Sequence, residues 1–190
     1  LIEEAKKHSL IFRDQAFLSG DQGEYPRDIE THRTTATGLT VLLRPVKISD
    51  EPLLKEFVYS LSDQSLYLRF LSPHMEIPHE DLQKFVVIDY TKQMAVFAIL
   101  EHEGREEIIG VARYAVEKDL HTAELAIVVR DDHHNRGIAM ELLSYAAYLA
   151  EKQGLLGFTV EVLADNRPVL HILKKFRDRG FDIQQSINEG

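Results

Sequence analysis

The segment that most constrains the fold is residues 127–143, IVVRDDHHNRGIAMELL, where strand-like aliphatic residues are followed by a polar stretch, a glycine and a helix. Between Gly137 and Glu141 there is no Asp, Glu, Ser or Thr, although acidic and capping side chains are favoured in a first helical turn. Free N–H groups beside Arg136 are what an anionic ligand such as a phosphate needs. A plain helix start with a solvated Arg136 explains the same residues equally well.

The hydrophobic pattern predicts an α+β domain with a mixed, mostly antiparallel sheet flanked by helices. Three successive strands form an expected meander, with EGRE at 103–106 as a hairpin turn, and a helix and strand then form a crossover unit. Strands are expected at 39–46, 93–102, 107–118, 123–130, 158–163 and 181–187, and helices at 49–61, 63–71, 79–88, 136–154 and 167–180.

Composition limits the classes of function. The chain has 190 residues, a net charge of −9 and no cysteine, which argues against general nucleic-acid binding, anionic membranes and thiol chemistry. Its apolar runs are too short to span a bilayer and no secretory signal is visible, so a cytoplasmic location is expected. Residues 1–36 lack periodicity and are predicted to be an N-terminal connector, followed by one domain over 37–190; the first residue, Leu1, suggests a piece of a longer chain.

Glu124 is a lone carboxylate in the apolar strand AELAIVV. Alternation places it on one face with Ala126 and Val128. Desolvation on such a face raises the pKa of a carboxyl toward the range of a useful general base. The alternative is a salt bridge to Arg113 on the neighbouring strand, since buried acids are usually paired.

Asn166 lies between a predicted strand and a predicted helix. It can cap that helix, with Pro168 near the first turn, or present its amide to a ligand. His133 and His134 are adjacent, so they point to opposite sides of an extended backbone, and no metal site is expected. Neither a P-loop, a three-glycine dinucleotide fingerprint nor a G-x-S-x-G elbow occurs in the sequence.

Taken in order, these residues resemble the GNAT acetyltransferase superfamily. The family signature Q/R-x-x-G-x-G/A is matched by HNRGIA at 134–139, with His134 where Gln or Arg is usual. The phrases LRPVKISDEPLL, DQSLYLRFLSP, VARY, AELAIVV and VEVLADNRPVL resemble more specifically the Pat-type protein lysine acetyltransferase branch. The resemblance extends from about Gly38 to Phe181 and implies the GNAT fold.

The resemblance implies transfer of an acetyl group from acetyl-CoA to a primary amine, most simply a lysine side chain of a protein, without a metal. Glu124 would be the general base. The pyrophosphate would bind at the helix start, the pantetheine arm along the strand, and Asn166 would contact that arm. The implied acetyl-CoA-binding residues are Val128, Val129, His134, Asn135, Arg136, Gly137, Ile138, Ala139, Met140 and Asn166.

Some features depart from the family pattern. Many members carry a tyrosine seven residues after the asparagine as general acid for the thiolate, and this chain has Leu173 there. The start, LIEEAKKHSLI, resembles the C-terminal end of acyl-CoA transferase or hydrolase proteins, which suggests an upstream CoA-transferase-like domain as partner. Two alternatives therefore stay open: a small-amine acetyltransferase, and a non-catalytic acyl-CoA sensor that regulates a larger CoA enzyme.

Overall fold

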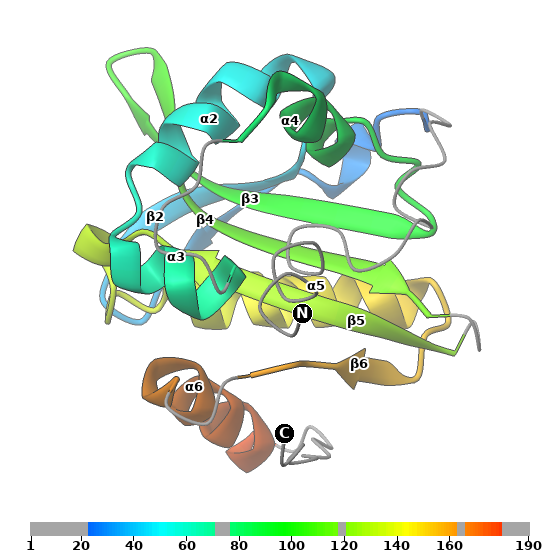
Figure 1. The fold of residues 1–190 in the computed structure, drawn as a ribbon. Coiled ribbons are helices and arrows are strands. Elements are labelled where there is room, and N and C mark those ends of the chain that lie inside the picture. The colour runs from blue at the N-terminus through cyan, green and yellow to red at the C-terminus, as the bar shows by residue number, and fades with distance from the viewer. Residues whose placement is uncertain (1–22, 71–76, 118–120, 163–165, 180–190) are drawn as a thin grey trace, which may run out of the picture.

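The computed structural model describes residues 23–70, 77–117, 121–162 and 166–179, which form a six-stranded sheet with helices on both faces (Figure 1). The strands follow one another across the sheet in chain order. They are β1 (Thr31–Thr34), β2 (Thr40–Pro45), β3 (Gln93–His102), β4 (Arg105–Val116), β5 (Thr122–Val129) and β6 (Gly157–Thr159). The α-helices are α2 (Glu51–Tyr59), α3 (Asp63–Phe70), α4 (His79–Val86), α5 (Ile138–Lys152) and α6 (Arg167–Asp178), and short 3-10 turns are η2 (Arg27–Ile29), η3 (Ile48–Asp50) and η4 (Asp131–His133).

The predicted α+β class and the antiparallel meander are confirmed. Neighbouring strands from β1 to β5 run antiparallel, and only β5 and β6 are parallel, as a crossover through α5 requires. The predicted hairpin is present between β3 and β4. Its central residues Glu103 and Gly104 have φ of 51° and 77°, which is the left-handed pair of a type I′ turn.

The two ends of the sheet differ from the sequence prediction. Residues 31–34, which fall in the predicted connector, form β1 and pair with β2. The sequence THRT has no apolar residue, and three of its four side chains are exposed at the sheet edge, so hydrophobic patterning could not reveal this strand. The strand predicted at 158–163 is shorter, with β6 ending at Thr159. The strand predicted at 181–187 lies outside the described residues.

Helix α5 packs closely on the sheet because one strand position has no side chain. A Cβ at Gly110 of β4 would lie 2.9 Å from Cδ1 of Leu142. The predicted apolar face of α5 is buried, and Leu142 has no exposed surface. The next residue of β4, Val111, lines a cavity on the opposite face of the sheet, beneath α2 and α4. The sheet therefore has α5 on one face and α2, α3 and α4 on the other (Figure 1).

A buried arginine joins β2 to the start of α2. The Arg44 guanidinium is 1% exposed and donates to both carboxylate oxygens of Asp50, at 2.7 and 2.9 Å. A further bond of 2.8 Å goes to Glu106 at the start of β4, and Lys47 N donates to Asp50 at 2.7 Å. The charge of Arg44 is thus neutralised by carboxylates from two other chain segments, a pairing that buried charges require.

We predict that Asp50→Asn lowers the free energy of unfolding by about 3 kcal/mol, because it leaves the Arg44 charge buried without its main partner. Urea denaturation measures this change. Glu106→Gln is the matched control: its side chain is 38% exposed, and the loss should stay below about 1 kcal/mol. Equal losses for the two variants would contradict this assignment.

Candidate functional site

The site begins where strand β5 loses its neighbour on one side. The parallel pairing of β5 with β6 covers only three residue pairs and ends at Glu124 opposite Thr159. From Ala126 to Val129, β5 stays paired with β4 alone. The two strands therefore diverge toward the C-terminal end of β5, and backbone groups on that side of β5 are left for another partner.

A cleft of about 410 Å³ lies at this divergence, between the end of β5, α3, the start of α5 and α6. Nine of the ten residues expected to hold acetyl-CoA line it: Val128, Val129, His134, Asn135, Gly137, Ile138, Ala139, Met140 and Asn166. The tenth, Arg136, is exposed and is not among the lining residues; its carbonyl accepts a hydrogen bond of 2.9 Å from Thr37 Oγ1. The structure thus brings strand end, loop and helix start to one cavity.

The start of α5 has no capping side chain. Gly137 is the N-cap residue, with φ of 82°, and Asn135 two residues earlier has φ of 59°. The first amide of this helix that bonds back to the chain is that of Met140, which donates to the Gly137 carbonyl at 3.1 Å. The preceding N–H groups at the positive end of the helix dipole line the cleft, which is the arrangement of an anion-binding helix start.

Glycine is required at position 137 on two grounds. Its φ is one that residues with a Cβ adopt only at a cost. A Cβ there would also lie 3.1 Å from Cβ of Thr35, in the turn between β1 and β2. Contact with that turn therefore fixes the position of the loop before α5.

His134 bonds to the strand that precedes it. Its Nε2 lies 2.8 Å from the Val129 carbonyl oxygen, so Nε2 carries the proton and donates. The ring therefore covers the end of β5 next to the cleft.

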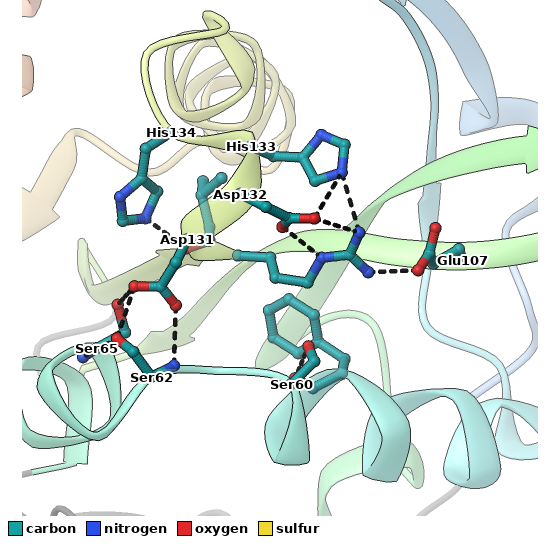
Figure 2. A network of polar contacts seen from close by, with 11 residues as sticks. Ser60, Ser62, Ser65, Glu107, Asp131, Asp132, His133 and His134 are labelled. Carbon is teal, nitrogen blue, oxygen red and sulfur yellow. Dashed lines mark hydrogen bonds and ion pairs between the residues drawn. The ribbon is translucent and has the colours of Figure 1, made fainter.

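Asp131 fastens the loop to helix α3, a contact that Figure 2 shows from close by. Its carboxylate accepts bonds from Ser62 N at 2.9 Å, Ser62 Oγ at 2.6 Å and Ser65 Oγ at 2.8 Å. Burial alone would raise the pKa of this carboxyl, but the hydrogen bonds from the two serines outweigh it, and the pKa is lowered. The loop before α5 and the α3 wall of the cleft are thus held together by an ionised aspartate.

A second group of contacts surrounds His133, whose side chain is 8% exposed. Arg130 donates to Asp132 at 2.7 Å and to His133 Nε2 at 3.0 Å, and it also pairs with Glu107 of β4 (Figure 2). Burial of the imidazole lowers its pKa, and the positive charge of Arg130 acts in the same direction. His133 is therefore neutral at neutral pH. Sequence analysis did not assign these roles.

Glu124 is half-buried, on the sheet face that carries α3. Its proposed structural partner, Arg113, is directly opposite Ala126 and so faces the same side. Arg113 donates to Gln93 Oε1 at 2.6 Å and to the Phe85 carbonyl at 3.2 Å. The charge of Glu124 also acts on Arg69 of α3, where it raises the pKa of the guanidinium against the effect of burial.

Asn166 combines the two alternatives that the sequence left open. Its Oδ1 accepts a bond of 3.3 Å from Val169 N, so it caps α6, and its side chain also lines the cleft. Eight lining residues from α3 and α6 were not predicted: Ser65, Leu68, Arg69, Pro168, Val169, His171, Ile172 and Lys175. Their positions depend on how α3 and α6 pack, for which the sequence carries no local signal.

Comparison with known proteins identifies the class that this fold and cleft define. Residues 40–177 match the acetyltransferase (GNAT) domain family. Because the match covers well over half of the chain, the chain belongs to the GNAT acetyltransferase family.

Solved structures and a curated relative agree with this assignment. The GNAT domain of S. lividans PAT has 29% sequence identity and a TM-score of 0.76, over 88% of this chain and 96% of that one. A variant of a cAMP-binding acyltransferase from Mycobacterium smegmatis has 26% identity and a TM-score of 0.53, over 78% of this chain and 44% of that one. An acetyltransferase of Pseudomonas aeruginosa is 28% identical over 117 residues, and the chain spans 63% of its length, just under two thirds.

Two negative findings hold for residues 23–70, 77–117, 121–162 and 166–179. In these segments, no three His, Asp or Glu side chains are grouped so as to hold a metal ion. No helix within them is both long and apolar enough to cross a membrane.

We predict that Gly137→Ala lowers acetyl-CoA affinity about tenfold, the effect of one lost charge-assisted hydrogen bond, because the loop must move away from Thr35. Gly154→Ala is the matched control, since Gly154 has φ of 81° but open space around its Cβ position. Both variants should lose about 1–2 kcal/mol of stability, the cost of a left-handed residue with a side chain. Calorimetric titration measures the affinities, and a similar loss of acetyl-CoA affinity in both variants would contradict the prediction.

Proposed function

We propose that this protein transfers an acetyl group from acetyl-CoA to a lysine side chain of a protein, with Glu124 as general base. The observation that carries the proposal is one cleft in which the uncapped start of α5 and the unpaired end of β5 meet, with Glu124 further back on the same strand. These features supply an anion site, backbone partners for an extended arm, and a base in the expected order.

The cofactor-facing residues have separate tasks in this proposal. The N–H groups around Gly137 bind the pyrophosphate, which needs no side-chain cation because the helix dipole already favours negative charge. Backbone groups of Val128 and Val129, apart from the Val129 carbonyl that already accepts from His134, receive the pantetheine arm, since β6 no longer pairs with β5 there. Asn166 presents its amide from the α6 side of the cleft.

The chemical step requires a neutral amine. Glu124 takes a proton from the acceptor ammonium, directly or through one water, and the freed lone pair attacks the thioester carbonyl carbon. The carbon–sulfur bond then breaks, the acetyl group remains on nitrogen, the nitrogen releases its second proton to solvent to give the neutral amide, and the thiolate leaves and takes up a proton. Leu173 occupies the position at which many family members have a tyrosine, so solvent is the proposed source of that last proton.

A protein lysine is the proposed acceptor because the quoted phrases resemble the Pat-type branch and because the structure is similar to the PAT GNAT domain along almost its whole length. A small amine would use the same base and the same cleft. The cytoplasm as location and a CoA-transferase-like domain upstream stay proposals from the sequence.

The general base is tested by Glu124→Gln, which keeps the size of the side chain and removes its basicity. We expect kcat to fall at least about 100-fold, the usual lower bound for a general base, with acetyl-CoA affinity unchanged. Glu151→Gln, an exposed residue of α5, is the control and should keep full activity. Retained turnover in Glu124→Gln would exclude the base assignment. If the protein shows no turnover but regulates a larger CoA enzyme, and Glu124→Gln leaves that regulation unchanged, the acyl-CoA sensor would be favoured.

The anion site is tested by calorimetric titration of the wild-type chain with acetyl-CoA, dephospho-CoA and acetyl-pantetheine. Dephospho-CoA keeps the pyrophosphate and should bind with comparable affinity. Acetyl-pantetheine lacks it and should bind at least about 100-fold more weakly, the loss of roughly two charge-assisted hydrogen bonds. Equal binding of acetyl-CoA and acetyl-pantetheine would show that the start of α5 holds no diphosphate.

A further inference from the structure

Arg69 lies at the boundary between two cavities. It lines the large cleft, and it also lines a second, smaller cavity of about 30 Å³ beneath α2, α3 and α4. Val128, two positions from Ala126 on the Glu124 face of β5, is shared by both cavities as well. The second cavity thus continues from the cleft on the side of the sheet where the acceptor amine must meet Glu124.

The walls of the small cavity are apolar except for three charged residues. Arg69, Arg113 and Asp81 contribute the charges, and Asp81 is already in an ion pair of 3.1 Å with Lys84. Its apolar lining residues are Leu54, Phe57, Val58, Phe70, Ile77, Leu82, Phe85, Val111, Ala126 and Val128. A guanidinium in such surroundings needs an anionic or polar partner.

The two arginines differ in how they are satisfied. Arg113 stacks on the Phe85 ring at 4.3 Å and bonds to Gln93 and to the Phe85 carbonyl. Arg69 has its guanidinium 4.8 Å from the centre of the Phe70 ring, and the structure shows no hydrogen bond from it to any of the described residues. The donors of Arg69 are thus available at the wall of the cleft.

Both guanidinium groups are charged at neutral pH. Burial lowers the pKa of Arg69 to about 10, against the influence of the Glu124 charge. Burial lowers the pKa of Arg113 to about 9, and the positive charge of Arg69 acts in the same direction. Two cations beside one carboxylate leave a local positive charge in a protein whose net charge is −9.

The size of the cavity limits the group that can reach Arg69. A space of about 30 Å³ holds about two water molecules, or a group of similar size such as a carboxylate. A guanidinium binds a carboxylate through two parallel N–H bonds, and the interaction is stronger where water is excluded. Arg69 is also held in place, because Asp131 fixes the first turn of α3 to the loop before α5.

We propose that Arg69 selects acceptors that carry a carboxylate next to the reacting amine, such as a lysine flanked by Asp or Glu. The inference rests on the proposed acetyl transfer and adds the acceptor class. Glu124 takes the amine proton, while Arg69 binds the neighbouring carboxylate and so orients the amine toward the thioester. The positive charge of Arg69 and Arg113 favours acidic side chains beside the lysine, although the protein as a whole is acidic.

The test uses two peptides of equal length, one with lysine between two glutamates and one with lysine between two glutamines. Calorimetry in the presence of CoA, which cannot donate an acetyl group, measures their binding. We expect the acidic peptide to bind wild type about tenfold more tightly and this ratio to fall to about one in Arg69→Gln, as loss of a charge-assisted hydrogen bond predicts. Arg69→Lys should keep part of the preference.

The controls separate recognition from folding and from catalysis. Acetyl-CoA binding reports whether Arg69→Gln is folded, and Arg105→Gln, an exposed arginine at the start of β4, should keep the wild-type ratio. Equal binding of both peptides by wild type, no binding of either, or an equal loss for both in Arg69→Gln would each overturn the proposal. The base assignment is tested by turnover, whereas this proposal is tested by the ratio of peptide affinities, which Glu124→Gln should leave unchanged. The two proposals can therefore fail separately.

Discussion

The constraint on which the site depends is the short pairing between β5 and β6. Their parallel pairing lasts for three residue pairs and stops at Glu124, while the pairing of β5 with β4 continues to Val129. Strand pairing on one side only leaves backbone donors and acceptors that no described strand pairs with, although His134 bonds to the Val129 carbonyl; such an edge is normally a liability. Here that edge lies inside the domain and forms one wall of the cleft.

The loop before α5 is positioned by contacts that are distant in the sequence. Thr37 donates to the Arg136 carbonyl from the turn between β1 and β2, and Ser62 and Ser65 bond to Asp131 from the start of α3. Both sets of contacts leave the N–H groups at the start of α5 uncovered. A loop held at its two ends keeps a fixed shape, so an anion binds there without a large cost for ordering the backbone.

The sequence predicts those features that depend on local pattern. The periodicity of α5, the strands of the meander and the Glu103–Gly104 turn follow from hydrophobic spacing and turn chemistry, and the structure confirms them. Strand β1 was not predicted, because its polar residues carry no alternation. The uncapped helix start and the ten candidate acetyl-CoA ligands could be named because they are consecutive or belong to a family motif; nine of the ten line the cleft, and their binding of acetyl-CoA stays a prediction. Arg69 could not be named, since only the packing of α3 against β5 brings it to the cleft.

Charge explains why the site can work in an acidic protein. Interactions between exposed charges are largely screened beyond about 8–10 Å at physiological salt, so the net charge of −9 has little effect inside the cleft. There, the nearby groups decide: the dipole of α5 at one end and the guanidinium of Arg69 at the other. A diphosphate at the helix start and an acidic acceptor at α3 would therefore each meet positive potential. The negative charge of Glu124 opposes the lowering of the Arg69 pKa by burial, so the proposed base favours the charged form of this guanidinium.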